Sequence, residues 1–398
     1  MNSKNIFTGI ITAMLGCTGA AVLLIDAAKT AGASRPELIS WVFAVYLLGG
    51  IMSITLTLMY KTPLIGAHSI SGAAFLGTAA AGFTLPQLSG SFIMAGLFIL
   101  VIGVTGIFTK FMELLPKTIV SAMLAGLVLN YVGKIVPAVK EMPFVGLLAL
   151  TGFFIVPKIS KKLPPAIGAM AFGLIGLLLW SPIGSLGNIS FVAPQMVKPE
   201  FSLLGLISIA IPLGILILSN DLAVALAALK QNGFRPPVTL TLVISGLGTA
   251  LAGLFGGHAL AVGGMATALT SSDESGPKKH RYWAALVAGT AFGLFGIFAW
   301  FTTGVIQMLP AAFISLVAGF SLLGVFIASI QAAFSKSTYR FSTAFAFVIA
   351  ASNITFLGIS APIWSLLLGA FAVWVLGEGH SNEEDKKTSK TDSIQTVN

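Results

Sequence analysis

Apolar stretches long enough to cross a lipid bilayer follow one another along almost the entire chain. A helix needs about 20 mostly apolar residues to span the hydrocarbon core, and fewer where the segment is broken or enclosed by protein. Of the 398 residues, 56% are hydrophobic and 9% are charged, and the mean hydropathy is +0.96. Soluble domains contain about 25% charged residues. The pattern therefore predicts an all-α integral membrane protein and excludes a soluble domain.

Proline, glycine and clusters of charge mark the ends of these stretches. Together they predict fourteen transmembrane segments, near 5–27, 37–59, 63–80, 90–112, 117–136, 142–157, 163–181, 201–229, 237–256, 257–273, 282–306, 310–333, 341–357 and 360–377. The polar stretch 380–398 follows the last segment, and we expect it to be a disordered cytoplasmic tail.

Basic residues are distributed unevenly between the two sides that fourteen segments would create. With the N-terminus in the cytoplasm, 17 of the 22 Lys and Arg residues fall on the cytoplasmic side. Cytoplasmic loops of membrane proteins carry this excess. The bias would be lost if the short segments 63–80 and 257–273 did not cross the membrane. Both termini are thus predicted to be cytoplasmic, and the net charge of +9 requires no nucleic-acid partner.

The motifs of common enzyme and cofactor sites are absent from the sequence. The single cysteine, Cys17, allows no disulfide within the chain and no cysteine metal site. There is no phosphate-binding loop and no HExxH pair, and no Ser-His-Asp set stands at a known spacing. We therefore expect neither enzymatic activity nor a metal or other cofactor.

Two pairs of similar stretches indicate an internal duplication. "PLIGAHSISGAA" (63–74) resembles "GLFGGHALAVGG" (253–264), and "ELLPKTIVSAMLAGLVL" (113–129) resembles "QMLPAAFISLVAGFSLL" (307–323). The offsets of 190 and 194 residues correspond to a unit of seven segments. Because seven is odd, the second copy must be inverted in the bilayer. Residues 1–190 are thus predicted to form one repeat and 191–379 its inverted partner, with substrate near the midplane between them.

Segments three and ten are among the shortest, are rich in glycine, and begin with stretches that favour extended backbone. Irregular backbone at membrane depth is tolerated where protein covers it or where it lines a cavity. We predict two half-helices that start near Ser69 and Ala259 and direct their N-terminal ends at one central anion site. An alternative is that glycine and alanine here only let helices pack closely. That alternative leaves the placement of His68 and His258 in both copies unexplained.

Asp221 is the acidic residue that lies deep within a predicted segment, 215–230. Ionisable groups at such depth usually face the bundle interior or a water-filled cavity and serve function, so Asp221 is a candidate proton carrier. It could instead be a protonated acid in a single interhelical hydrogen bond. His68 and His258 could titrate or contact substrate, or they could be satisfied core residues. The further candidates for substrate contact are Ser69, Ser71, Gly72, Asn220, Ala259 and Gly263, of which the polar members could also serve only as interhelical hydrogen-bonding residues.

Three longer stretches carry a family resemblance. These are "LTLMYKTPLIGAHSISGAAFLGTA" (56–79), "NDLAVALAALKQNGFRPPV" (220–238) and "FGGHALAVGGMATALTSSDESGPKKHRYWAAL" (255–286). They resemble the bacterial benzoate/proton symporter family, often called BenE-type, and the likeness extends over nearly the whole chain apart from the tail. That family is similar to the nucleobase and sulfate permeases.

The resemblance implies a specific architecture. Segments one to four and eight to eleven would form a core, and segments five to seven and twelve to fourteen a gate that could also make a homodimer contact. Segments three and ten would begin as short strands that pair at the centre. In the nucleobase relatives, acidic residues on segments eight and ten hold substrate and couple the proton. Asp221 matches the first, whereas His258 is the titratable group nearest to the second.

The sequence therefore predicts a proton-coupled secondary transporter of the bacterial inner membrane that imports an aromatic carboxylate such as benzoate. Its partners would be this small organic anion, protons and the lipid bilayer. Asp221, His258 and His68 are the predicted proton-coupling residues. The alternatives are a transporter of the same fold for a nucleobase or another anion, and an uncoupled channel or membrane scaffold.

Overall fold

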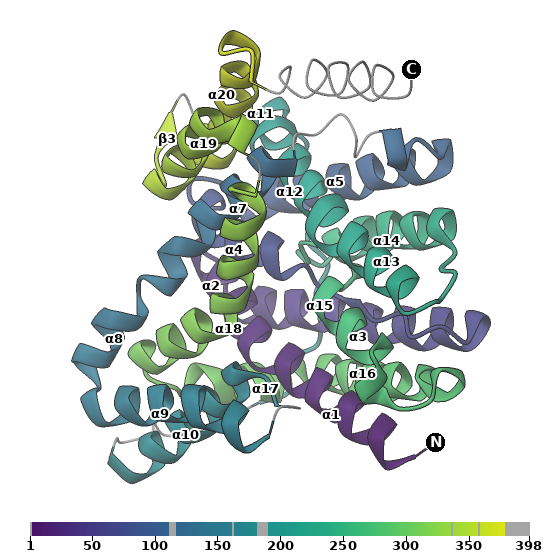
Figure 1. The fold of residues 1–398 in the computed structure, drawn as a ribbon, viewed down its shortest axis with the longest axis vertical. Helices are drawn as coiled ribbons and strands as arrows, with labels where there is room; N and C mark the ends of the chain where they lie inside the picture. The colour runs from purple at the N-terminus through teal and green to yellow at the C-terminus, as the bar shows by residue number, and fades with distance from the viewer. Residues whose placement is uncertain are drawn as a thin grey trace, which may run out of the picture.

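The computed structural model describes residues 2–110, 117–160, 163–180, 190–335, 337–356 and 359–378. Most of them are helical (Figure 1). The predicted tail, 380–398, lies outside the described residues. The helices are α1 (Ser3–Cys17), α2 (Gly19–Thr30), α3 (Arg35–Tyr60), α4 (Ile70–Ala79), α5 (Leu85–Thr105), α7 (Lys117–Val132), α8 (Ile135–Glu141), α9 (Pro143–Ile159), α10 (Pro165–Trp180), α11 (Leu203–Gly205), α12 (Ile211–Leu216), α13 (Ala223–Gln231), α14 (Val238–Gly253), α15 (Gly264–Ser271), α16 (Tyr282–Ile297), α17 (Ala299–Gln307), α18 (Ala311–Ala333), α19 (Arg340–Ser352) and α20 (Ala361–Val375).

Six stretches of helix are long and apolar enough to span a membrane among the described residues. They are Ser3–Thr30, Arg35–Tyr60, Leu85–Thr105, Lys117–Glu141, Leu203–Gln231 and Ala311–Ala333. The bent pair of α16 and α17 would make a seventh. The predictions of a mostly helical chain and of a multi-pass membrane protein are therefore confirmed, whereas the count of fourteen stays a prediction.

The transmembrane segment predicted over 282–306 is bent. Its two parts, Lys278–Ile297 and Ala299–Gln307, meet at an angle of 82°. A β-carbon at Gly296 would lie 2.5 Å from the backbone nitrogen of Leu47 in α3, so the chain presses closely on its neighbour just before the bend. Glycine also lowers the helix propensity there. The sequence predicts a transmembrane segment here but does not indicate the bend, because this contact is tertiary.

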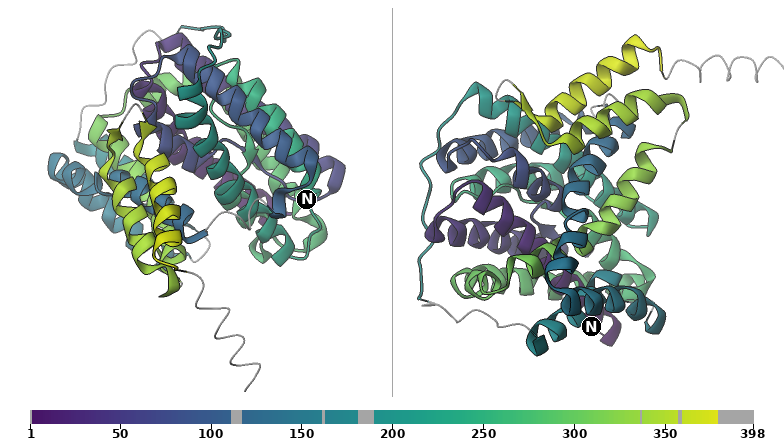
Figure 2. Two further views of the ribbon diagram at one scale, coloured as in Figure 1. Left: turned by 90° about the horizontal axis from the view of Figure 1, so that it is seen from above. Right: turned by 90° about the vertical axis from the view of Figure 1, so that its left-hand side faces the viewer.

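Helices pack in two groups. In one group, α3 contacts α16, α5 contacts α14, and α2 contacts α4; in the other, α7 contacts α18 and α19, and α9 contacts α10. Figures 1 and 2 show α9 and α10 side by side at one end of the molecule, and α19 and α20 side by side at the opposite end. Glycines allow the closest approaches: a β-carbon at Gly50 of α3 would lie 2.6 Å from the carbonyl oxygen of Gly289 in α16.

Two short strands pair at the centre of the first group. Strand β1 (Gly66–Ala67) pairs antiparallel with β2 (Ala261–Val262), with Gly66 opposite Val262. Each strand leads directly into a short helix, α4 after β1 and α15 after β2. A second small pair, β3 (Thr355–Phe356) and β4 (Ile359–Ser360), connects α19 to α20.

The second half-helix begins later than the sequence predicts. Helix α15 starts at Gly264, with Gly263 as its N-cap, and not near Ala259. A tight turn with a positive φ at Gly256 is followed by extended residues, and these continue through 259–263, which was expected to be helical. The caps Ser69 and Gly263 are therefore 194 residues apart, so His258 and His68 do not occupy equivalent places: His68 stands two residues before its helix and His258 six.

The segment that carries Asp221 is a helix interrupted by two π-helical turns, Leu206–Ala210 and Ile217–Leu222. The second turn contains both Asn220 and Asp221. A π-helical turn widens the helix and leaves its hydrogen-bond ladder irregular, and such turns occur often at functional sites. The local geometry therefore distinguishes this position from an ordinary helical one.

Candidate functional site

A cavity of about 930 Å³ lies between the two groups of helices and reaches the start of α4. Its volume falls within the range of ligand pockets, about 300–1,000 Å³. The walls are mostly apolar and include Leu124 of α7, Val224 of α13 and Phe292 of α16. Two lysines, Lys117 and Lys230, also line it. The cavity therefore combines apolar walls with a small number of polar groups.

Asp221 connects the π-helical turn to the start of α4. Its side chain is 7% exposed and lines the cavity. Carboxylate atom Oδ2 accepts a hydrogen bond from Ser69 Oγ at 2.5 Å and lies 3.5 Å from Ser71 Oγ. Ser69 Oγ is also the N-cap of α4, since it accepts from the backbone N–H of Gly72 at 2.9 Å. The carboxyl group is thus held at the positive end of a helix.

His258 is fully buried, and both of its ring nitrogens are engaged. Trp41 Nε1 donates to Nδ1 at 3.0 Å, so Nδ1 is an acceptor. In the neutral ring Nε2 then carries the hydrogen, and it donates to the carbonyl of Ser69 at 3.0 Å. A second proton on the ring would point at the N–H of Trp41. The contacts of His258 are those of a residue that fixes the backbone before α4.

His68 has one engaged nitrogen and one without a partner. Nε2 lies 3.2 Å from the hydroxyl of Tyr46. Nδ1 is buried and makes no hydrogen bond to any described residue. The side chain of His68 lines the cavity, whereas His258 is not among its lining residues in the described chain. The two histidines therefore have different surroundings, although their rings lie 5.5 Å apart.

The structure brings together most of the residues that the sequence singles out. The cavity is lined by His68, Ser71, Asn220, Asp221 and Gly263. Behind this surface, and not among the described lining residues, are Ser69, Gly72, His258 and Ala259. Of these, Ser69 still contacts Asp221, while Ala259 is fully buried beside His258.

Sequence reasoning missed the aromatic partners of the histidines. Tyr46 lines the cavity, donates to the carbonyl of Gly16 and contacts His68. Trp41 is fully buried and fixes His258. Tyr and Trp usually gather near the two ends of membrane spans. The position of Tyr46, ten residues into segment 37–59, was therefore unusual and could have marked it as a candidate site residue.

The cavity is closed at one end by contacts between the two groups of helices. Its lining includes Ile70 at the start of α4 and runs from Lys117 to Leu124 at the start of α7. Further along the same two helices, Gly77 lies against the hydroxyl of Tyr131. The helices thus diverge around the cavity and meet beyond it.

The closed end is tightly packed. Gly19 of α2 packs directly on Ser321 of α18. Tyr131 is 3% exposed, and its hydroxyl lies within the described closed end. The carboxylate of Asp26 lies beside it, since a β-carbon at Gly77 would be 3.4 Å from Asp26 Oδ2. We call the four residues Gly19, Ser321, Gly77 and Tyr131 the seal.

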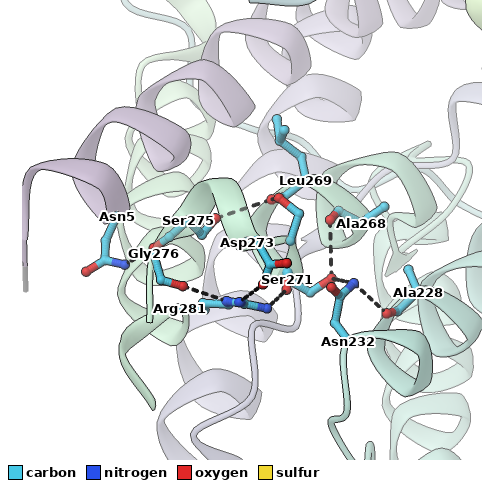
Figure 3. Close-up of polar contacts among 11 residues, drawn as sticks. Asn5, Ala228, Asn232, Ala268, Leu269, Ser271, Asp273, Ser275, Gly276 and Arg281 are labelled. Atoms are coloured by element: carbon cyan, nitrogen blue, oxygen red, sulfur yellow. Dashed lines mark hydrogen bonds and ion pairs between the residues drawn. The ribbon is translucent and has the colours of Figure 1, made fainter. Parts of the chain in front are cut away.

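A polar network fixes the other end of α15 (Figure 3). Arg281 is 7% exposed and donates to the carbonyls of Ser271 at 2.7 Å and Gly276 at 2.8 Å, and to Asp273. Its charge thus satisfies carbonyls at the C-terminus of α15, where cations are favourable. Asn5 of α1 donates to the carbonyl of Ser275, and Asn232, just after α13, donates to Ser271 Oγ at 3.2 Å.

Replacing Arg281 should destabilise the protein. Arg281→Met would leave two carbonyls without their charged donor, and hydrogen bonds of this kind contribute about 1.5–3 kcal/mol each at most. The ion pair adds little because the Asp273 side chain is 95% exposed. We expect Arg281→Met to lower the midpoint of thermal unfolding in detergent, with unfolding monitored by size-exclusion chromatography. Lys279→Met, at an exposed neighbouring position, should leave the midpoint unchanged. Equal midpoints for both variants would contradict this account of the network.

Two solved structures share this architecture. The chain is similar to the transmembrane domain of the cyanobacterial bicarbonate transporter BicA, with a TM-score of 0.60 at 17% identity over 92% of this chain and 97% of that one. It is also similar to SLC26A9, with a TM-score of 0.61 at 12% identity over 93% of this chain and 65% of that one. The chain therefore shares the fold of these two proteins.

The family follows from the sequence comparisons. Residues 1–375 match the BenE family, described as benzoate membrane transport protein. The chain is 30% identical over 377 residues to the inner membrane protein YdcO of Escherichia coli strain K12, covering 93% of this chain and 95% of that protein. It is 25% identical over 373 residues to the benzoate membrane transport protein of Acinetobacter baylyi, covering 92% and 94%. The chain belongs to the benzoate membrane transport family, which confirms the resemblance and points to a transporter rather than an enzyme.

Proposed function

We propose that this protein imports an aromatic carboxylate such as benzoate across the inner membrane together with a proton. The observation that carries the proposal is the position of Asp221, a membrane-depth carboxyl group on the cavity wall and hydrogen-bonded to the cap of α4. A carboxyl group there can exchange a proton with the cavity while the adjacent helix end attracts an anion. The names of the family and of the Acinetobacter relative support benzoate as the substrate.

The substrate would lie between the two half-helices. Its carboxylate would face the N-terminal ends of α4 and α15, near Ser71 and Gly263, which both line the cavity. Its ring would lie against apolar walls from both groups of helices, including Leu124 and Phe292. Asp221 would carry the proton. Such N-terminal helix ends suit anions because their backbone N–H groups are free.

The chain would be divided into two inverted repeats of seven segments, 1–190 and 191–379. Segments one to four and eight to eleven would form the core, and the others a gate that could support a homodimer. The two groups of packed helices support this division. With both termini in the cytoplasm, Lys117 and Lys230 stand at a cytoplasmic mouth and the seal lies toward the outside. Alternating access would then open the seal and close the mouth.

Uptake of labelled benzoate into proteoliposomes tests the proposal. We expect accumulation above the external concentration when an inward proton gradient is imposed, and equilibration without accumulation when the gradient is collapsed by an ionophore. Empty liposomes give the passive background. Downhill flux that ignores the gradient would indicate a channel, and competition by a nucleobase or by sulfate, with no effect of benzoate, would assign another solute to the same fold.

A further inference from the structure

The hydrogen bonds around Tyr46 fix where the hydrogen lies on His68. The hydroxyl of Tyr46 has one hydrogen, and it is donated to the carbonyl oxygen of Gly16, which can only accept. Toward His68 the same oxygen must therefore be the acceptor. Nε2 of His68, 3.2 Å away, consequently carries the ring hydrogen. In the neutral ring Nδ1 is then a bare lone pair.

That lone pair has no partner in the conformation observed. Nδ1 is buried and forms no hydrogen bond with any described residue. A buried acceptor without a donor is costly, and in native proteins such a group calls for a functional explanation. The ring nevertheless stands at the cavity wall, two residues before α4. It is therefore poised beside the place where the substrate carboxylate would bind.

We infer that Nδ1 of His68 is a second proton-binding site of the transport cycle and that Tyr46 is the residue that positions it. A proton from the outside solution adds to the Nδ1 lone pair, forms an imidazolium ion beside the carboxylate, and leaves to the cytoplasm after the substrate. This inference rests on the proposed function and extends it, since it separates the roles of the two histidines.

The other ionisable groups around His68 are engaged in contacts of their own, which leaves Nδ1 as the second proton-binding site. Tyr46 of α3 donates to Gly16, and His258, ahead of β2, has both nitrogens engaged. Cys17 of α1 lies beside Tyr46. Asp221 accepts a hydrogen bond from Ser69, the residue that follows His68. A positive charge on the His68 ring would attract a carboxylate bound in the cavity that this residue lines, so binding of the anion and of the proton would be coupled.

Histidine ring 15N NMR tests the positioning by Tyr46 without any substrate. His68→Gln identifies the His68 signals among those of the four histidines. We expect them to show the hydrogen on Nε2 in the wild-type protein, and to divide between both tautomers in Tyr46→Phe, which keeps the ring but loses the acceptor oxygen. A hydrogen on Nδ1 in the wild type, or an unchanged tautomer in Tyr46→Phe, would overturn the inference.

Proton uptake on benzoate binding tests the coupling. In weakly buffered detergent solution, we expect His68→Gln to take up about one proton fewer per benzoate bound than the wild type. Glutamine can still donate to Tyr46 from the position of Nε2, but it offers nothing at Nδ1. His280→Gln, outside the cavity, should match the wild type. An unchanged proton count in His68→Gln contradicts the inference, whereas a wild type that binds no benzoate contradicts the proposed function and leaves the NMR result to decide the tautomer.

Discussion

Asp221→Asn is expected to reduce gradient-driven benzoate uptake to the level of empty liposomes. Asparagine has nearly the same size, and its Oδ1 can still accept the hydrogen bond from Ser69 Oγ, so the start of α4 should stay in place. The amide cannot bind and release a proton, so the step that needs a proton at Asp221 fails even though His68 keeps its own site. Loss of one essential group in a coupled site commonly removes activity by several orders of magnitude, because no other residue replaces its chemistry.

The controls separate chemistry from folding. Asp221→Asn protein should elute as a monodisperse peak and unfold at the wild-type midpoint. Glu274→Gln, an exposed acid in the loop after α15, should transport at the wild-type rate. Binding of benzoate to Asp221→Asn should survive, since the helix ends that face the carboxylate are unchanged. Accumulation of benzoate by a correctly folded Asp221→Asn protein would exclude Asp221 as the proton carrier.

Much of the fold could be predicted because a bilayer allows few solutions. Fourteen apolar stretches and the duplicated Gly-rich segments predicted a helical membrane protein with a central site, and the family comparison confirms the class. The break between α16 and α17 could not be predicted, because it coincides with a close contact between Gly296 and α3. Nothing in the local sequence distinguishes that contact from ordinary helix packing.

The candidate site shows a similar division. Asp221 stood out in the sequence because a carboxyl group at membrane depth is costly unless it is used. The π-helical turn that presents it has no comparable signature. The similar sequences around His68 and His258 suggested that the two histidines are equivalent. In the structure the equivalent positions are instead the helix caps, Ser69 and Gly263. Hydrogen-bond partners such as Trp41 and Tyr46 come from distant segments, so only the structure could assign roles to the two rings.

Gly77→Ala is expected to shift the protein away from the sealed conformation. Its new β-carbon would fall on the hydroxyl oxygen of Tyr131, while the ring carbon that bears this oxygen would be 3.0 Å away. Overpacking of this kind costs about 1–3 kcal/mol, which corresponds to a change of roughly 5- to 150-fold in the equilibrium between the two conformations. Transport should slow by a comparable factor, because each cycle must pass through the sealed state.

The hydroxyl creates the most severe part of this clash, so its removal provides a second, compensating change. Tyr131→Phe by itself should have a smaller effect than Gly77→Ala, because it removes the hydroxyl beside the Asp26 carboxylate without adding a clash. In the double variant Gly77→Ala/Tyr131→Phe, the methyl group takes the place of the lost oxygen, and uptake should recover most of the wild-type rate. The three variants form a double-mutant cycle, in which residues in contact show non-additive effects. Gly293→Ala, whose β-carbon would meet nothing closer than 4.0 Å, is the matched control.

A labelling experiment reports on the seal independently of transport. Ala328 is exposed on the cavity wall, so a cysteine there, in a chain carrying Cys17→Ser, should react with a membrane-impermeant maleimide applied from the side of the mouth. Gly77→Ala should reduce the labelling rate, because opening the seal is accompanied by closing of the mouth. Adding Tyr131→Phe in the double variant should restore the rate. If Gly77→Ala slows uptake while labelling stays at the wild-type rate, the contact between Gly77 and Tyr131 stabilises the fold but does not govern access to the site.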